Sequence, residues 1–349
     1  MKKFSRCLIA LSFYFVLNSS IFANRWTPEM MIQYQRLSST AISEDGKFIA
    51  YEISTPILES EKSEFHSQIW LLSTYDESRF QLTQGKTSSS QPKFSPDNKW
   101  LGFLSARGEK KTRQLFIISV SGGESIQITD VASSVNRFDW SPDAMKIAFT
   151  MADPETDDDK KRKKEKRDWK IVDEDYKYNH LYVVSIEEID EPRQLTKGDM
   201  NVGSFDWSPD GAKIVYDHTE IPTANSSSTS NISIVGLASG SSRVIVDWGG
   251  FDASPKFSND GKRIAFVSDG DNPSWGREHY VYTASSSGVR KKKLQPTPSK
   301  YVNAIEGWSP DDSYIIVQEA NKTSRRYFYV PSRMNQHIFL HSFLHFPFD

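Results

Sequence analysis

The chain has 349 residues, of which 37% are hydrophobic and 25% are charged, so it is neither a disordered chain nor a polytopic membrane protein. Its 43 Lys and Arg residues nearly balance 45 Asp and Glu residues, and the net charge of -2 gives no broad electrostatic reason to expect a nucleic-acid partner. About 350 residues suffice for one large repeat domain but are tight for that domain plus a full hydrolase domain.

Residues 1–23 have the layout of a secretory signal peptide. Basic residues at positions 2, 3 and 6 precede an apolar stretch over residues 8–17, and small residues lead to Ala23, the expected cleavage point. An uncleaved anchor is the disfavoured alternative, because about 10 strongly apolar residues are too few to span a bilayer. Cleavage would also remove Cys7, the only cysteine. The sequence therefore predicts an exported protein, periplasmic or extracellular, with no membrane span after processing and no disulfide.

A phrase that recurs six times follows this segment. It consists of an aromatic residue or its substitute, a serine, a proline or its substitute, an aspartate, a turn residue and an alternating apolar run. The serines of the six copies are Ser43, Ser95, Ser141, Ser208, Ser258 and Ser309. Successive copies thus begin about 50 residues apart, with one longer interval, which is the signature of a repeat architecture.

The phrase has the chemistry of a hairpin turn followed by a strand. Proline presets φ at about −65°, aspartate bonds its own backbone, and glycine adopts positive φ without strain. The last turn position of the six copies holds Gly46, Asn98, Ala144, Gly211, Gly261 and Asp312. Alanine would be strained by about 1 kcal/mol in the left-handed conformation, so we expect a relaxed turn at Ala144. The alternating apolar run predicts a half-buried strand, and the aromatic before the turn is expected to face a neighbour.

A second unit lies between the phrases: an apolar strand, a polar turn and a shorter strand that often ends in Leu-Thr. It occupies residues 68–83, 114–129 and 180–196. Four strands per period of about 50 residues predict one β-propeller blade per period. The sequence therefore predicts an all-β β-propeller over residues 24–330, built from about six four-stranded blades. A β-sandwich is the alternative, but it does not explain the four-strand period.

Two polar stretches interrupt the pattern. The longer interval contains a charged insertion at about residues 153–168, which we interpret as a solvated loop rather than as a nucleic-acid-binding patch. Residues 224–231, rich in Ser, Asn and Thr, are a second predicted loop. No nucleic-acid partner is expected.

Two further stretches point to a family. The phrase by itself resembles the repeat of the periplasmic TolB propeller and of other exported propellers. Residues 27–43, beginning Thr-Pro-Glu-Met, are similar to the opening of the prolyl oligopeptidase family of serine peptidases, particularly its dipeptidyl and acylaminoacyl peptidase branches. Residues 167–184 and 194–199 are similar to a blade of the same branch. The resemblance spans about residues 26–330.

The resemblance implies a propeller that caps an α/β-hydrolase domain and restricts substrates to short peptides. The hydrolase would use a Ser-His-Asp triad with its serine in a Gly-x-Ser-x-Gly elbow. That phrase is absent from this sequence, and its nearest approach, Gly307 to Asp311, is the sixth propeller turn. No catalytic residue is therefore assigned, and the chain as written is not expected to hydrolyse peptides.

Two groups of side chains are candidates for binding. Members of the dipeptidyl branch hold a substrate amine with paired glutamates, but Glu187 and Glu188 lie in a predicted hairpin turn, so we interpret them as solvated. In the tail, His337, His341 and His345 would share one face of a helix and could bind a metal ion. No acidic residue or cysteine accompanies them, so we assign no metal site and no cofactor.

Residues 331–349 lose both the repeat and the family resemblance. We interpret them as an apolar tail produced by truncation or a shifted reading frame. The sixth phrase would then leave its blade unfinished after Val330, and the propeller would be incomplete. Open strand edges of this kind favour aggregation or pairing with another chain.

Two functional hypotheses follow. In the first, the chain is the exported, noncatalytic, substrate-gating propeller of a prolyl-oligopeptidase-like serine peptidase whose catalytic domain is missing here. Short peptides would pass its channel in the intact enzyme. In the second, it is a self-standing TolB-like propeller that binds a protein partner in the cell envelope.

Overall fold

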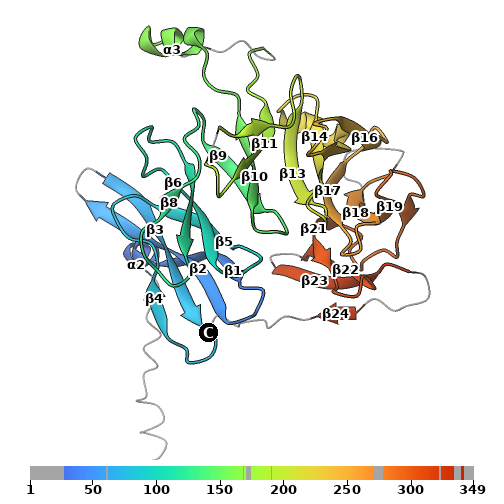
Figure 1. Cartoon of the computed structure of the whole chain (residues 1–349), viewed down its shortest axis with the longest axis horizontal. Helices are drawn as coiled ribbons and strands as arrows, with labels where there is room; N and C mark the ends of the chain where they lie inside the picture. The colour runs from blue at the N-terminus through green and yellow to red at the C-terminus, as the bar shows by residue number, and fades with distance from the viewer. Residues whose placement is uncertain are drawn as a thin grey trace, which may run out of the picture.

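A computed structural model describes residues 27–59, 62–167, 169, 174–189, 191–270, 278–321, 324–333 and 339–341. These residues form six four-stranded sheets, arranged side by side around an arc (Figure 1). The predicted β-propeller fold is therefore confirmed, and the β-sandwich is excluded because a sandwich stacks only two sheets. The predicted signal peptide lies outside the described residues.

We number the sheets as blades 1 to 6 in chain order. Blade 1 contains β1 (Arg36–Ile42), β2 (Phe48–Glu59), β3 (Lys62–Ser73) and β4 (Arg79–Gln81). Blade 2 contains β5 (Ser89–Phe94), β6 (Trp100–Ser105), β7 (Gln114–Ser119) and β8 (Ile126–Gln127). Blade 3 contains β9 (Val135–Trp140), β10 (Lys146–Ala152), β11 (Asn179–Ser185) and β12 (Arg193–Gln194).

The second half of the arc repeats this arrangement. Blade 4 contains β13 (Asn201–Trp207), β14 (Lys213–Thr219), β15 (Asn231–Gly236) and β16 (Ser242–Val246). Blade 5 contains β17 (Asp252–Phe257), β18 (Arg263–Ser268), β19 (Tyr280–Ser285) and β20 (Lys292–Lys293). Blade 6 contains β21 (Val302–Trp308), β22 (Tyr314–Asn321), β23 (Ser324–Pro331) and β24 (Phe339–His341). Every blade is an antiparallel meander in which consecutive strands pair.

Blade 6 is complete, which corrects the expectation of an unfinished sixth blade. Residues of the apolar tail form β24, which pairs with β23 through Tyr327 and His341, Phe328 and Leu340, and Tyr329 and Phe339. An exposed strand edge carries unpaired backbone N–H and C=O groups, and an apolar segment of high β-propensity satisfies them by adding a strand. The prediction failed because the tail carries none of the repeat's turn residues.

The recurring phrase forms the turn between the first and second strands of each blade. In blade 2, for example, the Ser95 hydroxyl donates to Asp97 (2.6 Å) and accepts from the Trp100 N–H (3.0 Å). The last turn residue has positive φ in all six turns, including Ala144 at 59°. The relaxed turn expected at Ala144 is therefore wrong: the shared hydrogen bonds of the turn impose the left-handed conformation on an alanine.

The Leu-Thr ending joins the third and fourth strands of a blade. The Thr83 hydroxyl accepts from the Ile69 N–H (2.9 Å) and donates to Gln68 (2.6 Å). In blade 2 the same contacts join Thr129 to Leu115 and Gln114. We call this arrangement the threonine clip. It explains why a threonine recurs at a buried position, because its hydroxyl satisfies a backbone N–H that the short fourth strand leaves free.

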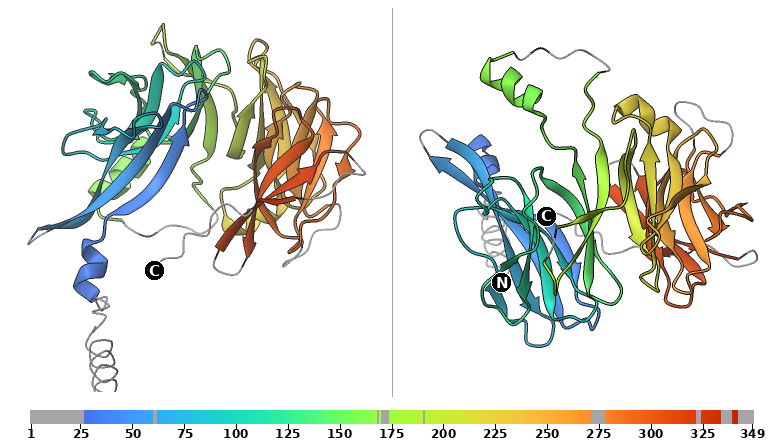
Figure 2. Two further views of the ribbon diagram at one scale, coloured as in Figure 1. Left: turned by 90° about the horizontal axis from the view of Figure 1, so that it is seen from below. Right: turned by 45° about the horizontal axis from the view of Figure 1, so that its top comes forward.

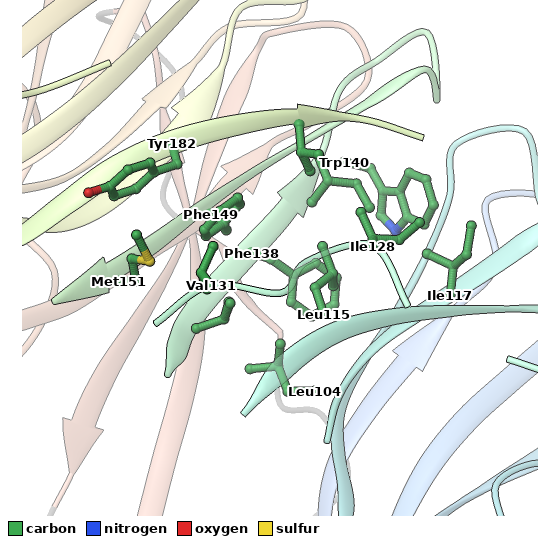
Figure 3. Close-up of a cluster of buried hydrophobic side chains, with 13 residues drawn as sticks. Leu104, Leu115, Ile117, Ile128, Val131, Phe138, Trp140, Phe149, Met151 and Tyr182 are labelled. Atoms are coloured by element: carbon green, nitrogen blue, oxygen red, sulfur yellow. The ribbon is translucent and has the colours of Figure 1, made fainter. Parts of the chain in front are cut away.

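Five apolar clusters hold consecutive blades together, one at each junction. At the junction of blades 2 and 3, side chains of β7 in blade 2 interdigitate with side chains of β9 and β10 in blade 3 (Figure 3). Leu115 and Ile117 there face Phe138, Phe149 and Trp140. The alternating pattern of the phrase thus supplies one face of each interface, as expected for half-buried strands.

Blades 1 and 6 end the arc, and among the described residues no apolar cluster joins them. Figure 1 shows the two blades on either side of the opening. Blade 1 consequently has one sheet face covered by blade 2 and one face that no other blade covers among the described residues. We call the second face, which includes Leu37, Ile42, Tyr51 and Trp70, the open face of blade 1.

The charged insertion contains a helix, α3 (Asp157–Lys164), where a loop is predicted. Thr156 and Asp159 form a reciprocal capping box, three aspartates occupy the first turn and basic residues the last. Ion pairs such as Lys160–Asp157 (3.1 Å) and Arg162–Asp158 (3.1 Å) support it. These local effects stabilise a helix end without any packing. The insertion is nevertheless solvated as predicted, since α3 buries no residue and stands away from the sheets (Figures 1 and 2).

Two more short helices lie outside the sheets. Helix α2 (Pro28–Gln33) precedes β1, and Thr27 caps its N-terminus through a side chain that accepts from the Met30 N–H. The second predicted loop contains a 3₁₀-helix, η1 (Ala224–Thr229). No helix among the described residues is long and apolar enough to cross a membrane.

Candidate functional site

The first strand of each blade, which we call the inner strand, lies on the inner side of the arc (Figure 1). Four consecutive inner strands place a charged residue directly before the aromatic of the turn phrase. These residues, which we call the charged belt, are Lys93, Asp139, Asp206 and Lys256. Lys93 pairs with Asp139 (3.2 Å), and Lys256 pairs with Asp206 (2.8 Å). The same position in blades 1 and 6 is uncharged, so the belt is confined to the middle of the arc.

Hydrogen bonds between blades hold the backbone of the belt. The indole N–H of Trp140 donates to the Lys93 carbonyl (3.1 Å), and that of Trp308 donates to the Lys256 carbonyl (3.1 Å). The turn aromatics therefore face a neighbouring blade, as predicted. An inner strand pairs with only one other strand, so some of its carbonyls lack a partner within the sheet. Each indole donates to such a carbonyl of a neighbouring blade and so helps to set the distance between the two blades.

Asp206 replaces the indole at the junction of blades 4 and 5. Phe257 stands there in place of tryptophan and has no side-chain N–H, and its backbone N–H donates to the Asp206 carboxylate (2.8 Å). The same carboxylate accepts from Lys256 (2.8 Å). Although burial lowers it, the pKa of Lys256 is raised overall by the carboxylates of Asp206 and Asp139. Burial likewise raises the pKa of Asp206, against the attraction of Lys256. The pair is thus a structurally anchored part of the inner wall.

The belt contains ammonium and carboxylate groups on the inner strands, but no serine, threonine or cysteine that could act as the nucleophile of a serine-type peptidase. A serine–histidine contact exists elsewhere, between Ser233 and the Nε2 atom of His218 (2.8 Å). Both side chains are buried, at 1% and 8% exposure, and burial lowers the pKa of His218. A substrate carbonyl cannot reach this serine, so the contact is structural rather than catalytic.

The nearest approach to a nucleophile phrase is the turn between β21 and β22. The Ser309 hydroxyl donates to Asp311 (2.7 Å) and accepts from the Tyr314 N–H (2.9 Å). These are the bonds of the other five turns, and Ser309 is buried. The interpretation of this segment as a propeller turn is confirmed.

The paired glutamates lie in the turn between β11 and β12. The backbone N–H groups of Glu187 and Glu188 both donate to the Ser185 hydroxyl (3.3 Å), and both side chains are exposed. The two carboxylates therefore lie in a solvated turn, as the sequence predicts. None of the four residues of the charged belt forms an ion pair with them.

The tail histidines do not form a described helix. His341 belongs to the strand β24, whereas His337 and His345 lie outside the described residues. A strand does not place residues four apart in the way a helix does. Within the part of the chain that the structure describes, no group of three or more His, Cys, Asp or Glu side chains is positioned to hold a metal ion.

Sequence reasoning missed the charged belt. The signal was available, because the belt residues occupy one fixed position immediately before the aromatic of four phrases. In a blade, the inner strand has one face toward each neighbouring blade, so a charged residue beside a buried aromatic must find a partner across a junction.

No protein-family model matches the chain. Among curated proteins, it is 30% identical over 206 residues to the uncharacterized peptidase YuxL of Bacillus subtilis, a match that covers 55% of this chain and 31% of that protein. It is 28% identical over 324 residues to dipeptidyl-peptidase 5 of Porphyromonas gingivalis, which covers 83% of this chain and 45% of that protein. The chain thus spans less than half the length of these relatives.

Solved structures show the same fold. The Pyrococcus horikoshii acylaminoacyl peptidase matches with a TM-score of 0.64 at 16% identity, over 88% of this chain and 47% of that chain. The Porphyromonas gingivalis dipeptidyl peptidase 4 matches with a TM-score of 0.56 at 14% identity, over 90% of this chain and 46% of that chain. The chain is therefore a homologue of dipeptidyl-peptidase 5 and peptidase YuxL, with the propeller fold of prolyl oligopeptidase-family peptidases.

Proposed function

We propose that the chain is the noncatalytic, substrate-gating propeller of an exported serine peptidase that acts on short peptides. The similarity to dipeptidyl-peptidase 5 over 324 residues carries this proposal. Peptide hydrolysis by this chemistry needs a serine, a base and an orienting carboxylate in contact. The sequence has no Gly-x-Ser-x-Gly phrase, so the nucleophile would come from a polypeptide segment other than these blades.

The inner strands supply a physical basis for gating. An extended peptide is one chain wide, whereas a folded domain of 100 residues has a radius of gyration of about 13 Å. A ring of inner strands would therefore admit the first and reject the second, provided that the opening between blades 1 and 6 is covered in the intact enzyme. The charged belt would add an electrostatic preference for peptides, whose termini are charged at neutral pH.

Peptide binding by the purified chain tests the proposal. We expect a di- or tetrapeptide to shift the NMR signals of the indole N–H groups of Trp140 and Trp308, which lie beside the charged belt, while a folded protein leaves them unchanged. The exposed Trp169, on the charged insertion, is the internal control. Equal shifts from peptide and folded protein, or shifts confined to Trp169, would overturn the gating role.

An activity assay tests the noncatalytic role. We expect residues 24–349 to leave a fluorogenic dipeptide substrate intact, because no described serine combines exposure with a base and a carboxylate. Turnover that survives removal of contaminating peptidases would contradict this part of the proposal.

Export is tested separately by N-terminal sequencing of the protein from the cell envelope, which we expect to begin at Asn24.

A protein-binding module in the envelope is the second candidate function. The open face of blade 1 favours it, since Leu37 and Ile42 are 65% and 64% exposed there. Exposed apolar patches of this kind mark interaction sites. A pull-down from envelope extract should then enrich one partner with the native chain and lose it with Ile42→Lys.

A further inference from the structure

Arg107, in the loop between β6 and β7, is held in one orientation by five side chains. Its Nε donates to Ser105 (3.2 Å), its Nη1 to Ser125 (3.1 Å) and its Nη2 to Ser89 (2.7 Å). The guanidinium also lies over the rings of Phe103 (5.0 Å) and Phe116 (5.4 Å). Three hydroxyls and two aromatic rings thus position a cation before any ligand arrives.

The charge of Arg107 has no counter-ion in the described part of the chain. Among the described residues, no carboxylate lies within 4.0 Å of its guanidinium, whereas Arg162 has three aspartate partners. Arg107 is partly buried, and burial lowers its pKa, yet a guanidinium stays charged at any physiological pH. A partly buried cation is ordinarily paired with an anion, whereas the hydrogen bonds of Arg107 to described residues go only to neutral hydroxyls. The site as described therefore lacks an anion.

Arg107 lines an open groove of about 550 Å³ between the fourth strand of blade 1 and the turn between β7 and β8. Phe80 and Gln84 line it from blade 1, and Gly122, Gly123 and Ser125 line it from blade 2. A guanidinium carries five N–H donors, and Arg107 uses three. Two donors therefore remain for a ligand.

We propose that this groove binds the carboxylate of a peptide, with Arg107 as the anchoring residue. Arginine pairs with carboxylates through parallel N–H···O bonds, and the Ser125 hydroxyl and the backbone of Gly122 and Gly123, which line the groove, supply further donors at low steric cost. The proposal rests on the proposed function for its ligand class, since a gating propeller meets short peptides. Each short peptide carries one terminal carboxylate whatever its side chains.

Three small probes test the site by isothermal titration calorimetry and by the NMR signal of the Arg107 Nε–H. The probes are acetyl-Gly-Ala with a free C-terminus, its C-terminal amide, and acetyl-Asp-amide. We expect the first to bind, the amide to bind about tenfold more weakly or not at all, and acetyl-Asp-amide to show whether a side-chain carboxylate substitutes. The Arg107→Met variant should lose the difference between the acid and the amide.

Glu124 provides a matched variant, because it lines the same groove and is exposed. Glu124→Gln removes a competing negative charge without touching the serines or rings around Arg107. We expect it to strengthen binding of the free acid and to leave the amide unchanged. Since this variant needs no change at Arg107, it tests the site even if Arg107→Met fails to fold.

The outcomes separate this site from the proposed function. If the acid and the amide bind equally while the Trp140 signal shifts, gating stands and the carboxylate site is overturned. If acetyl-Gly-Ala shifts the Arg107 signal and its amide does not, while no peptide shifts the Trp140 and Trp308 signals, the site is supported and the gating proposal fails. An unchanged Arg107 signal with every carboxylate overturns the site.

Discussion

The type of the last residue in a turn phrase depends on which residue occupies the second position of the turn in the preceding blade, because the two positions lie in contact. Where the preceding turn has a backbone N–H at its second position, the matching side chain accepts from it: Asn98 from Glu44 (2.8 Å), and Asp312 from Asn259 (2.8 Å). Where that position is proline, the matching residue is small. A Cβ on Gly261 would lie 3.6 Å from the Pro209 ring. The turns therefore form a line of contacts between blades.

This matching predicts opposite effects at two positions. Asn98→Ala should lower the free energy of unfolding by about 1–2 kcal/mol, because the Glu44 N–H loses its acceptor and alanine is strained at positive φ. Ala144→Gly, the matched control, should be neutral or stabilise by up to about 1 kcal/mol, since relief of φ is partly offset by a lost buried methyl. Urea denaturation measures both, and a larger loss for Ala144→Gly would contradict the matching.

Asp252 is the residue with the clearest unfavourable environment. It is fully buried, and neither carboxylate oxygen accepts a hydrogen bond from the described residues. Burial raises its pKa to about 6. It pairs across the strands with Ser268, and the equivalent position in blade 2 is Ser89, opposite Ser105. A serine at this position therefore suits the fold.

Asp252→Ser should stabilise the protein above neutral pH. The folded pKa of about 6 exceeds the unfolded value of about 3.9, so the wild type loses stability as pH rises through 6. The variant lacks that loss, which amounts to roughly 3 kcal/mol at pH 8. Unfolding free energies between pH 4 and 8 measure it, and parallel curves for variant and wild type would refute the assignment.

At the scale of elements, the threonine clip of blade 3 differs from the others. His180 stands where blades 1 and 2 have glutamine, and its Nδ1 lies 3.2 Å from the Thr196 hydroxyl. That hydroxyl also accepts from the Leu181 N–H (3.0 Å), so it links the imidazole to the backbone of the same strand. The Nε2 faces Asp153 at 3.6 Å. Burial lowers the pKa of His180, although Asp153 opposes the shift.

His180→Gln should make the fold less sensitive to acid. A lowered folded pKa means that stability is complete above the unfolded histidine value of about 6.5 and declines as pH falls below it. Glutamine restores the clip seen in blades 1 and 2 and does not titrate. We expect melting temperatures of variant and wild type to agree at pH 8 and to diverge below pH 6, with the wild type lower. Identical pH profiles would count against a role for His180.

For the whole molecule, the open face of blade 1 is the dominant surface feature. Its central residues Tyr51 and Trp70 correspond to Phe103 and Phe116 of blade 2, which are buried against blade 1. The same positions in every later blade are covered by the preceding blade. The open face is thus an interface without a neighbour, and a groove of about 570 Å³ runs across it.

An uncovered interface predicts self-association at high concentration. Ile42→Lys should reduce it, because Ile42 is 64% exposed on this face and a lysine keeps its charge in water. Val244→Lys, at a 50% exposed residue on the fourth strand of blade 4, is the matched control and should change nothing. Sedimentation velocity over a concentration series measures both. Equal behaviour of the two variants would show that the open face is not the surface responsible.

Much of this architecture could be predicted because the repeat acts locally. The turn phrase and the Leu-Thr ending set strand boundaries through bonds between residues that are close in sequence, as at Ser95 and Trp100. Helix α3 was missed although its capping box is equally local, because a run of charges was interpreted by composition alone. The fourth strand of blade 6 was missed because it depends on an available strand edge rather than on its own sequence.

By itself, the sequence determined the all-β repeat, the number of phrases, the solvated glutamates and the absence of a nucleophile phrase, because each depends on residue types at short spacing. Only the tertiary structure decided which charges meet and which stay unpaired. Lys256 and Asp206 lie 50 residues apart and pair across a blade junction. Arg107 contacts three serines and two phenylalanine rings, and the Asp252 carboxylate has no hydrogen-bond partner among the described residues. The physical reason is that the packing of neighbouring blades decides which side chains meet across a junction. The sequence of one repeat does not reveal which side chains the next blade places opposite it.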